Sequence, residues 1–327
     1  MRPFTYSRAD SLDQAISQSS NPHAAIMAGG TTLVDLMRGD LAGADQIVDI
    51  AHIPGLAAIE VEGEVLRFGA LARMADVAEN RFLKRNYPAL VESLQLAASQ
   101  QIRNAATLGG NLLQRTRCVY FRDGVSDCNK RVPGSGCAAL DGEDREMALF
   151  GTSDRCVATY PGDWGTALAA FDTSIEIASD TGKRVVDFAD FHIAYGDDPA
   201  RESILRPGEI VTAILVRATE AGKRSTYIKV RDRQSYAYAV TSAAVALEMD
   251  GETVIAARVA LGGVASKPWR AQAAEAVLIG RRLDEALAIE AGHAAFTDAK
   301  PLRHNQFKIE LGARTVARAA LVAKGKI

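Results

Sequence analysis

The grouping of the cysteines is the feature that most constrains this chain. All four, Cys118, Cys128, Cys137 and Cys156, lie within 39 positions of a chain of 327 residues. Four cysteines can form two disulfides in three pairings. A chain of this length buries a sizeable core without disulfides, and nothing marks it as directly secreted. The grouping therefore favours one metal or iron–sulfur site, around which a single segment has to fold.

The spacing of the cysteines separates the kinds of site that they can form. Nine, eight and eighteen residues lie between successive cysteines, whereas zinc ribbons and fingers usually bring ligands in close pairs about two to four residues apart. Iron–sulfur clusters need four thiolates but tolerate longer loops. The residues that tight wrapping requires are present: Pro133, Gly134 and Gly136. A [4Fe–4S] cluster is the favoured interpretation; a zinc site and a solvated basic loop with unrelated thiols are the alternatives.

The charge pattern sets the same segment apart and excludes several functions. Between residues 107 and 137, five basic residues face two acidic ones, although the net charge of the whole chain is only −2. That balance argues against a nucleic-acid or membrane-surface partner. The N-terminus has no apolar core of a signal peptide, and no apolar run of membrane-spanning length occurs. We therefore expect a cytoplasmic chain without a membrane span, unless a signal-bearing partner exports it.

Length and pattern predict two domains. We expect a first domain over residues 1–222, made of subdomains 1–55 and 56–222 with an insertion at 115–157, and a second over 223–327. Strands are expected at 24–30, 46–50, 208–216, 225–230 and in two hairpins at 56–71 and 237–265. Helices are expected at 31–40, 88–99, 270–280, 283–296 and 305–324, and a helix leading into a strand at 163–179. The long hairpin followed by helices predicts an α+β arrangement.

Two glycine pairs resemble cofactor-binding loops. Gly29 and Gly30 follow a short apolar stretch and precede a helix that Thr31 or Thr32 would cap and Gly39 would end. Gly109 and Gly110 occupy a similar place in "TLGGNLL". A strand–Gly–Gly–helix turn lets backbone N–H groups approach a phosphate, so two of them could hold a pyrophosphate from both sides. Neither pair matches a Rossmann or P-loop fingerprint, and two plain glycine turns remain the alternative.

The segments "AGGTTLVDLM" and "IRNAATLGGNLLQ" make the chain resemble the FAD-binding, or medium, subunits of molybdenum hydroxylases, the xanthine dehydrogenase family. The resemblance covers nearly the whole chain. It implies a PCMH-type FAD-binding domain, of the vanillyl-alcohol-oxidase kind, followed by a CO-dehydrogenase-flavoprotein-like C-terminal domain with an antiparallel sheet and helices. It also implies FAD as a cofactor.

The resemblance assigns flavin contacts position by position. The loop around the FAD pyrophosphate would contain Ile26, Met27, Ala28, Gly29, Gly30, Thr31, Thr32 and Leu33, and the second clamp would contain Thr107, Gly110 and Asn111. Asp163 would supply a polar contact before a helix, and Ile210 would lie near the adenine or flavin edge. Lys229 would lie on the strand that approaches the isoalloxazine ring, where a cation would stabilise reduced flavin.

The cysteine segment resembles one subset of that family, typified by the periplasmic aldehyde oxidoreductases of enterobacteria. In that subset the FAD subunit carries an additional [4Fe–4S] cluster, which implies Cys118, Cys128, Cys137 and Cys156 as its ligands. Cys118 and Asp123 would also border the flavin. Basic residues of the segment would offset the charges of two anionic cofactors: Arg115, Arg117, Arg122, Lys130 and Arg131.

The function implied is an electron-transfer subunit of a heterotrimeric aldehyde oxidoreductase, with no substrate-oxidising residue of its own. Its partners would be a large subunit with the molybdenum cofactor, a small subunit with [2Fe–2S] clusters, and an external electron acceptor. The cluster would be an electron wire or a structural element. A stand-alone flavoenzyme of the same fold and a binding module stabilised by a four-cysteine zinc site are the alternative functions.

Overall fold

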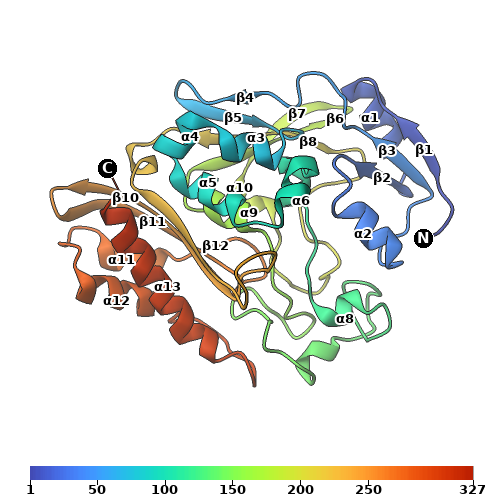
Figure 1. Ribbon diagram of the computed structural model, residues 1–327. Helices are drawn as coiled ribbons and strands as arrows, with labels where there is room; N and C mark the ends of the chain where they lie inside the picture. The colour runs from blue at the N-terminus through green and yellow to red at the C-terminus, as the bar shows by residue number, and fades with distance from the viewer. Residues whose placement is uncertain (327) are drawn as a thin grey trace.

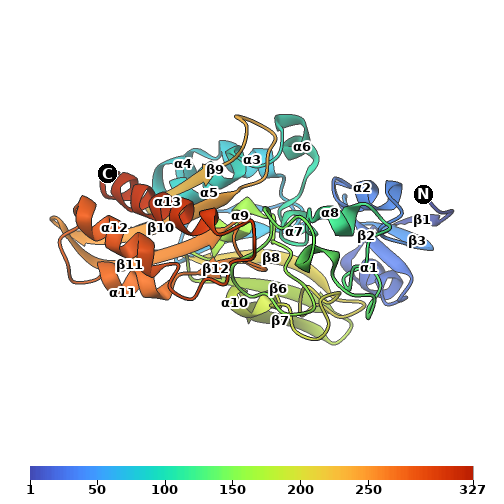
Figure 2. The ribbon, with the colours of Figure 1, turned by 90° about the horizontal axis from the view of Figure 1, so that it is seen from below.

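The computed structural model describes residues 1–326, which form three β-sheets with helices packed against them. The chain begins at one end of the molecule with a small parallel sheet, and the C-terminal sheet and its helices lie at the other end (Figures 1 and 2). The largest sheet and most of the helices lie between them. Among residues 1–326, no helix is both long and apolar enough to cross a membrane.

The N-terminal unit is a three-stranded parallel sheet. Its strands β1 (Thr5–Arg8), β2 (Ala24–Met27) and β3 (Gln46–Asp49) are ordered β1-β3-β2. Helix α1 (Leu12–Ser19) connects β1 to β2, and α2 (Leu33–Arg38) connects β2 to β3. Parallel strands need such crossovers, because a tight turn can only join antiparallel neighbours. The first glycine pair lies in the turn between β2 and α2.

The central sheet has five antiparallel strands in the order β4-β5-β8-β6-β7. The strands are β4 (Ile59–Glu60), β5 (Val65–Gly69), β6 (Thr173–Ser179), β7 (Gly182–Asp187) and β8 (Ile210–Arg217). The chain leaves the sheet after β5 and returns at β6. The segment between these strands holds the second glycine pair and all four cysteines.

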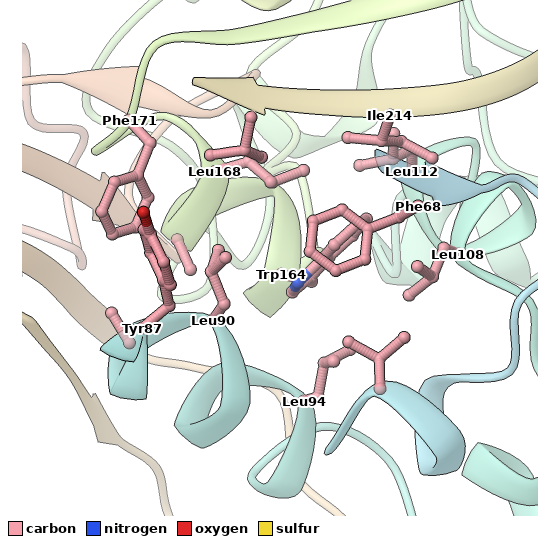
Figure 3. Packing of buried hydrophobic residues seen from close by; sticks show 14 of the residues in the cluster. Phe68, Tyr87, Leu90, Leu94, Leu108, Leu112, Trp164, Leu168, Phe171 and Ile214 are labelled. Carbon is pink, nitrogen blue, oxygen red and sulfur yellow. The ribbon is translucent and has the colours of Figure 1, made fainter. Parts of the chain in front are cut away.

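The regular secondary structure between β5 and β6 is helical, and irregular loops connect the helices. It contains α3 (Met74–Glu79), α4 (Arg81–Asn86), α5 (Pro88–Gln95), α6 (Gln100–Ala105), α7 (Leu108–Leu112), α8 (Val119–Arg122), a 3₁₀ turn at Ala138–Leu140 and α9 (Asp163–Leu168), while α10 (Phe188–Phe191) follows β7. The α9 side chain Trp164 is fully buried and meets Phe68 of β5 edge to face at 5.8 Å (Figure 3). This core attaches α9 to the central sheet.

The C-terminal unit is a four-stranded antiparallel sheet in the order β12-β11-β10-β9. Its strands are β9 (Ser225–Val230), β10 (Thr241–Asp250), β11 (Thr253–Gly262) and β12 (Trp269–Arg270), and α11 (Gln272–Leu278), α12 (Glu285–Ala294) and α13 (Phe307–Lys324) follow. Strand β10 is buried on both faces. Val245 and Leu247 belong to the cluster with the three helices, whereas Ala244 and Ala246 belong to the central core. Small alanines therefore let the sheet pack closely on the central unit.

The structure confirms the α+β class, the two hairpins and the three C-terminal helices. The structure also places a strand or a helix in each of the other expected segments. One interpretation was wrong: the second glycine pair lies inside α7 and follows helix α6, so it is not a strand–Gly–Gly–helix turn. Several short elements were not predicted, namely strands β1, β7 and β12 and helices α1, α3, α4, α6, α7, α8 and α10. The boundary between residues 222 and 223 stays a prediction; it falls in the 3₁₀ turn Glu220–Gly222 and the residue after it, just before β9.

Candidate flavin site and cysteine insertion

The first glycine turn lies directly against the start of the second glycine segment. A Cβ atom at Gly29 would lie 2.0 Å from the carbonyl oxygen of Ala105, a distance that no side chain can occupy. Gly30 has a φ of +70°, which favours glycine. The first pair is therefore required both by a close approach of two backbones and by a left-handed turn.

The second glycine segment is organised by Thr107, which caps α7. Its hydroxyl accepts a hydrogen bond from the N–H of Gly110 at 3.3 Å. Gly109 packs against Ala70, whose Cβ would be 3.0 Å from a Cβ added at Gly109. Gly109 therefore allows the helix to approach the residue that follows β5.

A cavity of about 260 Å³ lies between the two glycine segments. The sequence-predicted contacts on its wall are Ile26, Ala28, Gly29, Gly30, Thr31, Thr32, Leu33, Thr107, Gly110 and Ile210. Ile210, the first residue of β8, is far from both glycine pairs in the sequence but lines the same cavity. Met27, also predicted, does not line this cavity.

A larger cavity of about 670 Å³ adjoins the first. Thr31, Thr32 and Gly110 line both, so the two cavities form one extended space. Asn111, Cys118, Asp163 and Lys229 are the other predicted contacts on the wall of the larger cavity. Asp123 lies outside both cavities: its exposed carboxylate accepts hydrogen bonds from the N–H groups of Val125 and Ser126. A flavin contact of Asp123 remains a prediction.

A buried ion pair forms part of the wall of the larger cavity. The Lys229 ammonium lies 2.8 Å from the Asp163 carboxylate and also donates to the carbonyl oxygen of Leu96 at 3.1 Å. The Tyr227 hydroxyl donates to the other Asp163 oxygen at 2.6 Å. Burial raises the pKa of Asp163 above its ordinary value, although Lys229 and Tyr227 oppose that shift. The charge of Lys229 is therefore largely offset within the protein.

Tyr227 was not predicted as a site residue. It precedes Lys229 by two positions on β9, and alternate residues of a strand point to the same face, so the period of the strand was the available signal. Its pKa is raised well above the ordinary value by burial and by Asp163. Tyr227 therefore stays protonated and serves as a hydrogen-bond donor to the carboxylate.

Two buried polar atoms on the larger cavity lack partners. Asn111 Oδ1 and Ser242 Oγ make no hydrogen bond within residues 1–326. A buried polar atom without a partner costs about 1–3 kcal/mol, so it is usually satisfied by a ligand or by water. Together with the two glycine segments, which bring backbone close to the narrow cavity, these atoms fit an extended, polar ligand such as FAD.

The cysteine insertion gathers its four thiols in one place. Cys118, Cys128 and Cys156 are buried, Cys137 is partly covered, and all four contact the apolar cluster around Phe121. Cys128 and Cys137 face each other across an antiparallel bridge, and none of the four forms a disulfide. The structure thus brings together thiols up to 38 positions apart in the sequence.

Asn129, which sequence analysis did not identify, holds the loops of the insertion together. Its side-chain oxygen accepts from the N–H groups of Gly134 and Gly136, both at 3.0 Å, and its nitrogen donates to the carbonyl oxygen of Arg155 at 2.9 Å. The first two bonds shape the turn between Cys128 and Cys137. The third attaches this turn to the residue before Cys156.

The thiols differ in their tendency to ionise. Burial raises the pKa of Cys118 to about 11. A hydrogen bond from Cys156 lowers the pKa of Cys137 to about 6, and the same bond together with burial raises that of Cys156. In residues 1–326, no three or more His, Cys, Asp or Glu side chains form a group that could hold a metal ion. That finding does not support the four-cysteine zinc site, and it does not show the predicted [4Fe–4S] cluster.

The five basic residues expected to offset the charges of the cofactors are paired within the protein. Arg117 and Arg122 bind Asp35, while Arg115 and Lys130 bind Glu202. The remaining one, Arg131, donates to the carbonyl oxygens of Tyr120 and Phe121 at 2.8 and 2.9 Å. The two acidic partners lie outside the insertion, so the excess of positive charge in the sequence is partly cancelled in the fold.

Family comparison first defines the class of protein. The family described as "FAD binding domain in molybdopterin dehydrogenase" matches residues 2–216, and the family described as "CO dehydrogenase flavoprotein C-terminal domain" matches residues 226–323. Together they span nearly all of the chain in the order in which the two parts occur. The class is therefore an FAD-binding flavoprotein that serves as a subunit of an oxidoreductase.

Individual relatives narrow the class. The chain is 42% identical over 329 aligned positions to the aldehyde oxidoreductase FAD-binding subunit PaoB of Escherichia coli K12, with all of both chains covered. It is 28% identical to the carbon monoxide dehydrogenase medium chain of Afipia carboxidovorans, over 86% of this chain and 82% of that one. A chain in the crystal structure of the Cu,Mo-CO dehydrogenase superposes with a TM-score of 0.78 at 26% identity, with complete coverage of both chains. The chain belongs to the FAD-binding subunits of the molybdenum hydroxylases, the CO dehydrogenase and xanthine dehydrogenase family, as its sequence predicted.

Proposed function

We propose that this chain is the FAD- and [4Fe–4S]-containing electron-transfer subunit of a heterotrimeric molybdenum-dependent aldehyde oxidoreductase. The single observation that carries the proposal is the 42% identity, over the full length of both chains, to a protein named as an aldehyde oxidoreductase FAD-binding subunit. The aldehyde is oxidised in a partner that holds the molybdenum cofactor, and a small partner with [2Fe–2S] clusters delivers the electrons. The compartment of the complex is set by whichever partner carries an export signal.

The residues of this chain bind and orient FAD. The two glycine segments would hold its pyrophosphate in the narrow cavity, Ile210 would lie near the adenine or flavin edge, and the larger cavity would receive the flavin ring. When bound, FAD supplies the ability to collect electrons and pass them to an external acceptor. The ion pair of Asp163 and Lys229 keeps the wall of the larger cavity close to neutral.

The four cysteines are the proposed ligands of the cluster. Their support is that four free thiols converge in one partly buried place with no disulfide between them. Cluster binding requires thiolates, so it releases protons from thiols such as Cys118. Because Cys118 also lines the larger cavity, a cluster held by the four cysteines would lie beside the flavin site and would serve there as an electron wire.

Metal analysis of the chain separated from its partners tests the proposal, with Cys128→Ser as the diagnostic variant. The unmodified chain should contain about four iron and four acid-labile sulfide, and the variant should lose most of both while still retaining FAD. The matched control is Val125→Ser, an exposed substitution in the same insertion that should keep the cluster. Unchanged iron in Cys128→Ser, or one zinc with no iron in the parent, contradicts the cluster.

The electron-transfer role is tested on the purified complex. An aldehyde that the complex oxidises should bleach its flavin absorbance under anaerobic conditions, and should leave that of the isolated flavin-loaded chain unchanged. The chain should also co-purify with one partner that contains molybdopterin and one that contains [2Fe–2S] clusters. Bleaching of the isolated chain would instead support a stand-alone flavoenzyme.

A further inference from the structure

Asp35 connects the flavin side of the molecule to the cysteine insertion. It lies in the first turn of α2, three residues after Thr32, which lines both cavities. Its Oδ2 atom accepts from Arg117 at 3.1 Å and from Arg122 at 2.5 Å, and Asp35 and Arg117 themselves line the larger cavity. Figure 2 shows α8, which ends at Arg122, on the same side of the molecule as α2. One carboxylate thus joins the helix after the first glycine turn to both ends of α8.

The ion pairs of Asp35 are partly exposed to solvent, since the Asp35 side chain is 46% exposed and that of Arg117 is 40% exposed. Burial disfavours the Asp35 carboxylate, but hydrogen bonds and charge from Arg122 and Arg117 outweigh it and hold its pKa below the ordinary value. The Arg122 side chain is only 20% exposed. Two guanidinium groups share one carboxylate, so the trio keeps one net positive charge at the edge of the larger cavity. An anionic ligand in that cavity therefore acts on the trio through charge as well as contact.

Contacts continue from α8 to the cysteines. Cys118 is the N-cap residue of α8 and lies between the two arginines in sequence. At the other end, Arg131 donates to the carbonyl oxygens of Tyr120 and Phe121. Arg131 lies three residues after Cys128, which is bridged to Cys137. A displacement of α8 would therefore be transmitted to the Cys128–Cys137 pair through Arg131 and the backbone.

The second anchor of the insertion lacks this connection. Glu202 binds Arg115 at 2.6 Å and Lys130 at 2.5 Å, and it lines neither of the two cavities assigned to the flavin. Glu202 therefore stabilises the insertion without contacting either glycine segment. The two acidic residues offer a matched comparison, because each binds two cations of the insertion but only Asp35 is on the flavin side.

We propose that Asp35 is a positioning residue that couples FAD binding to the conformation of the cysteine insertion. Bound FAD restricts the motion of α2 and of the edge of the larger cavity. Through its ion pairs, Asp35 then restricts the motion of α8 and of the cysteines. By linkage, an ordered insertion strengthens FAD binding by the same factor. The coupling rests on FAD as the ligand of the two cavities, as in the proposed function, and holds whether or not the cysteines carry a cluster.

The test measures thiol reactivity in the full chain, purified without flavin or metal and kept reduced. Cys137 is the reporter, because it is the least covered of the four cysteines and lines neither cavity, so FAD cannot shield it directly. Its alkylation by iodoacetamide is followed by peptide mass spectrometry with and without saturating FAD, and FAD binding is measured separately by flavin fluorescence. We expect FAD to slow the alkylation by about 5- to 20-fold, within the usual range of such couplings.

Asp35→Asn should bind FAD more weakly, by up to the factor of the coupling, and at saturating FAD the alkylation of Cys137 should then be slowed by less than about 2-fold. Glu202→Gln should speed the alkylation of Cys137 both with and without FAD, because it loosens the insertion alone. The ratio of the alkylation rate without FAD to the rate with FAD should stay equal to that of the parent. A merely structural role of Asp35 would make the two variants behave alike. The coupling would be overturned if FAD slowed the alkylation of Cys137 equally in Asp35→Asn and in the parent. It would also be overturned if bound FAD left the alkylation rate of Cys137 in the parent unchanged.

If Asp35→Asn does not fold, the double variant Arg117→Gln with Arg122→Gln breaks the same ion pairs from the side of the insertion and leaves α2 unchanged. In this double variant too, FAD should slow the alkylation of Cys137 by less than about 2-fold. Slowing as strong as in the parent would overturn the coupling. Failure of the parent to bind FAD would be seen directly in the fluorescence measurement. That result would refute the proposed function itself, and the coupling with it.

Discussion

At the scale of single residues, the sequence identifies the charged groups but not their partners. The basic character of the insertion is visible in the sequence, and it suggested compensation of anionic cofactors. In the fold, Arg117 and Asp35 are paired although 82 positions separate them. Lys229, assigned as a cation beside the flavin, is likewise paired with Asp163, 66 positions away. Local patterns carry no information about such long-range pairs, because the topology alone brings them together.

His192 provides a prediction at this scale. It is buried among aromatic rings, and its Nε2 atom lies 3.0 Å from the carbonyl oxygen of Leu112. Burial lowers its pKa to about 4. The unfolded chain takes up a proton at this residue below about pH 6.5 and the native chain does not until about pH 4, so stability falls as the pH decreases through that window.

The His192→Gln variant should remove this part of the pH dependence. Glutamine can still donate to the carbonyl oxygen of Leu112 but does not titrate. Between pH 7 and 4.5, the free energy of unfolding of the parent should fall by about 2–3 kcal/mol more than that of the variant. Urea denaturation at the two pH values measures the difference. Equal decreases in the two proteins would show that His192 is not neutral in the native state.

At the scale of elements, the first glycine turn was predictable and the second was not. The apolar stretch before Gly29 and the helical pattern after Gly30 gave the strand, turn and helix correctly. Around Gly109 the same reasoning failed, because Thr107 caps a helix of only five residues that glycine would not by itself favour. Close packing on Ala70 requires glycine there, and packing against a distant strand leaves no local signal.

Gly29→Ala tests the close approach of the two glycine segments. The added methyl group would collide with the carbonyl oxygen of Ala105, which belongs to backbone and cannot rotate away. Overpacking of this kind typically costs about 1–3 kcal/mol, so the FAD affinity should fall by about 10-fold or more as the segments separate. Titration of the flavin-free chain with FAD measures the loss. Gly196→Ala is the control, since no atom lies within 4 Å of its added Cβ, and its affinity should match that of the parent.

At the scale of the whole molecule, the sequence predicted the class and order of the parts, since long strands and helices have strong periodic patterns. It did not predict how the parts are joined. Strand β10 carries Ala244 and Ala246 on the face toward the central core, and Ala243, Val245 and Leu247 on the face toward the helices, and both sets are buried. An apolar residue predicts burial but does not show which part of the molecule covers it. The contact between the C-terminal sheet and the central core, which forms the joint between the two parts, was therefore visible only in the structure.

The ion pair of Asp163 and Lys229 crosses that joint, because α9 belongs to the segment 2–216 and β9 to the segment 226–323. Both side chains are almost completely buried, at 6% and 1% exposure. Removal of one partner of a buried pair leaves an uncompensated charge and typically costs about 3–5 kcal/mol, whereas removal of both is often nearly neutral. Lys229→Met alone should therefore destabilise the flavin-free chain strongly, and Asp163→Asn together with Lys229→Met should restore most of that stability.

Urea denaturation of the parent, both single variants and the double variant gives the coupling energy of the pair. Lys223→Met is the control, because its partner Glu220 is 77% exposed and such surface pairs contribute only about 0–1 kcal/mol. A double variant as unstable as the sum of its single variants would contradict the prediction. It would mean that each side chain stabilises its own part of the molecule and that the two parts are held together by apolar packing alone. Recovery in the double variant would instead make the pair a charge-matched contact between the two parts, directly on the wall of the flavin cavity.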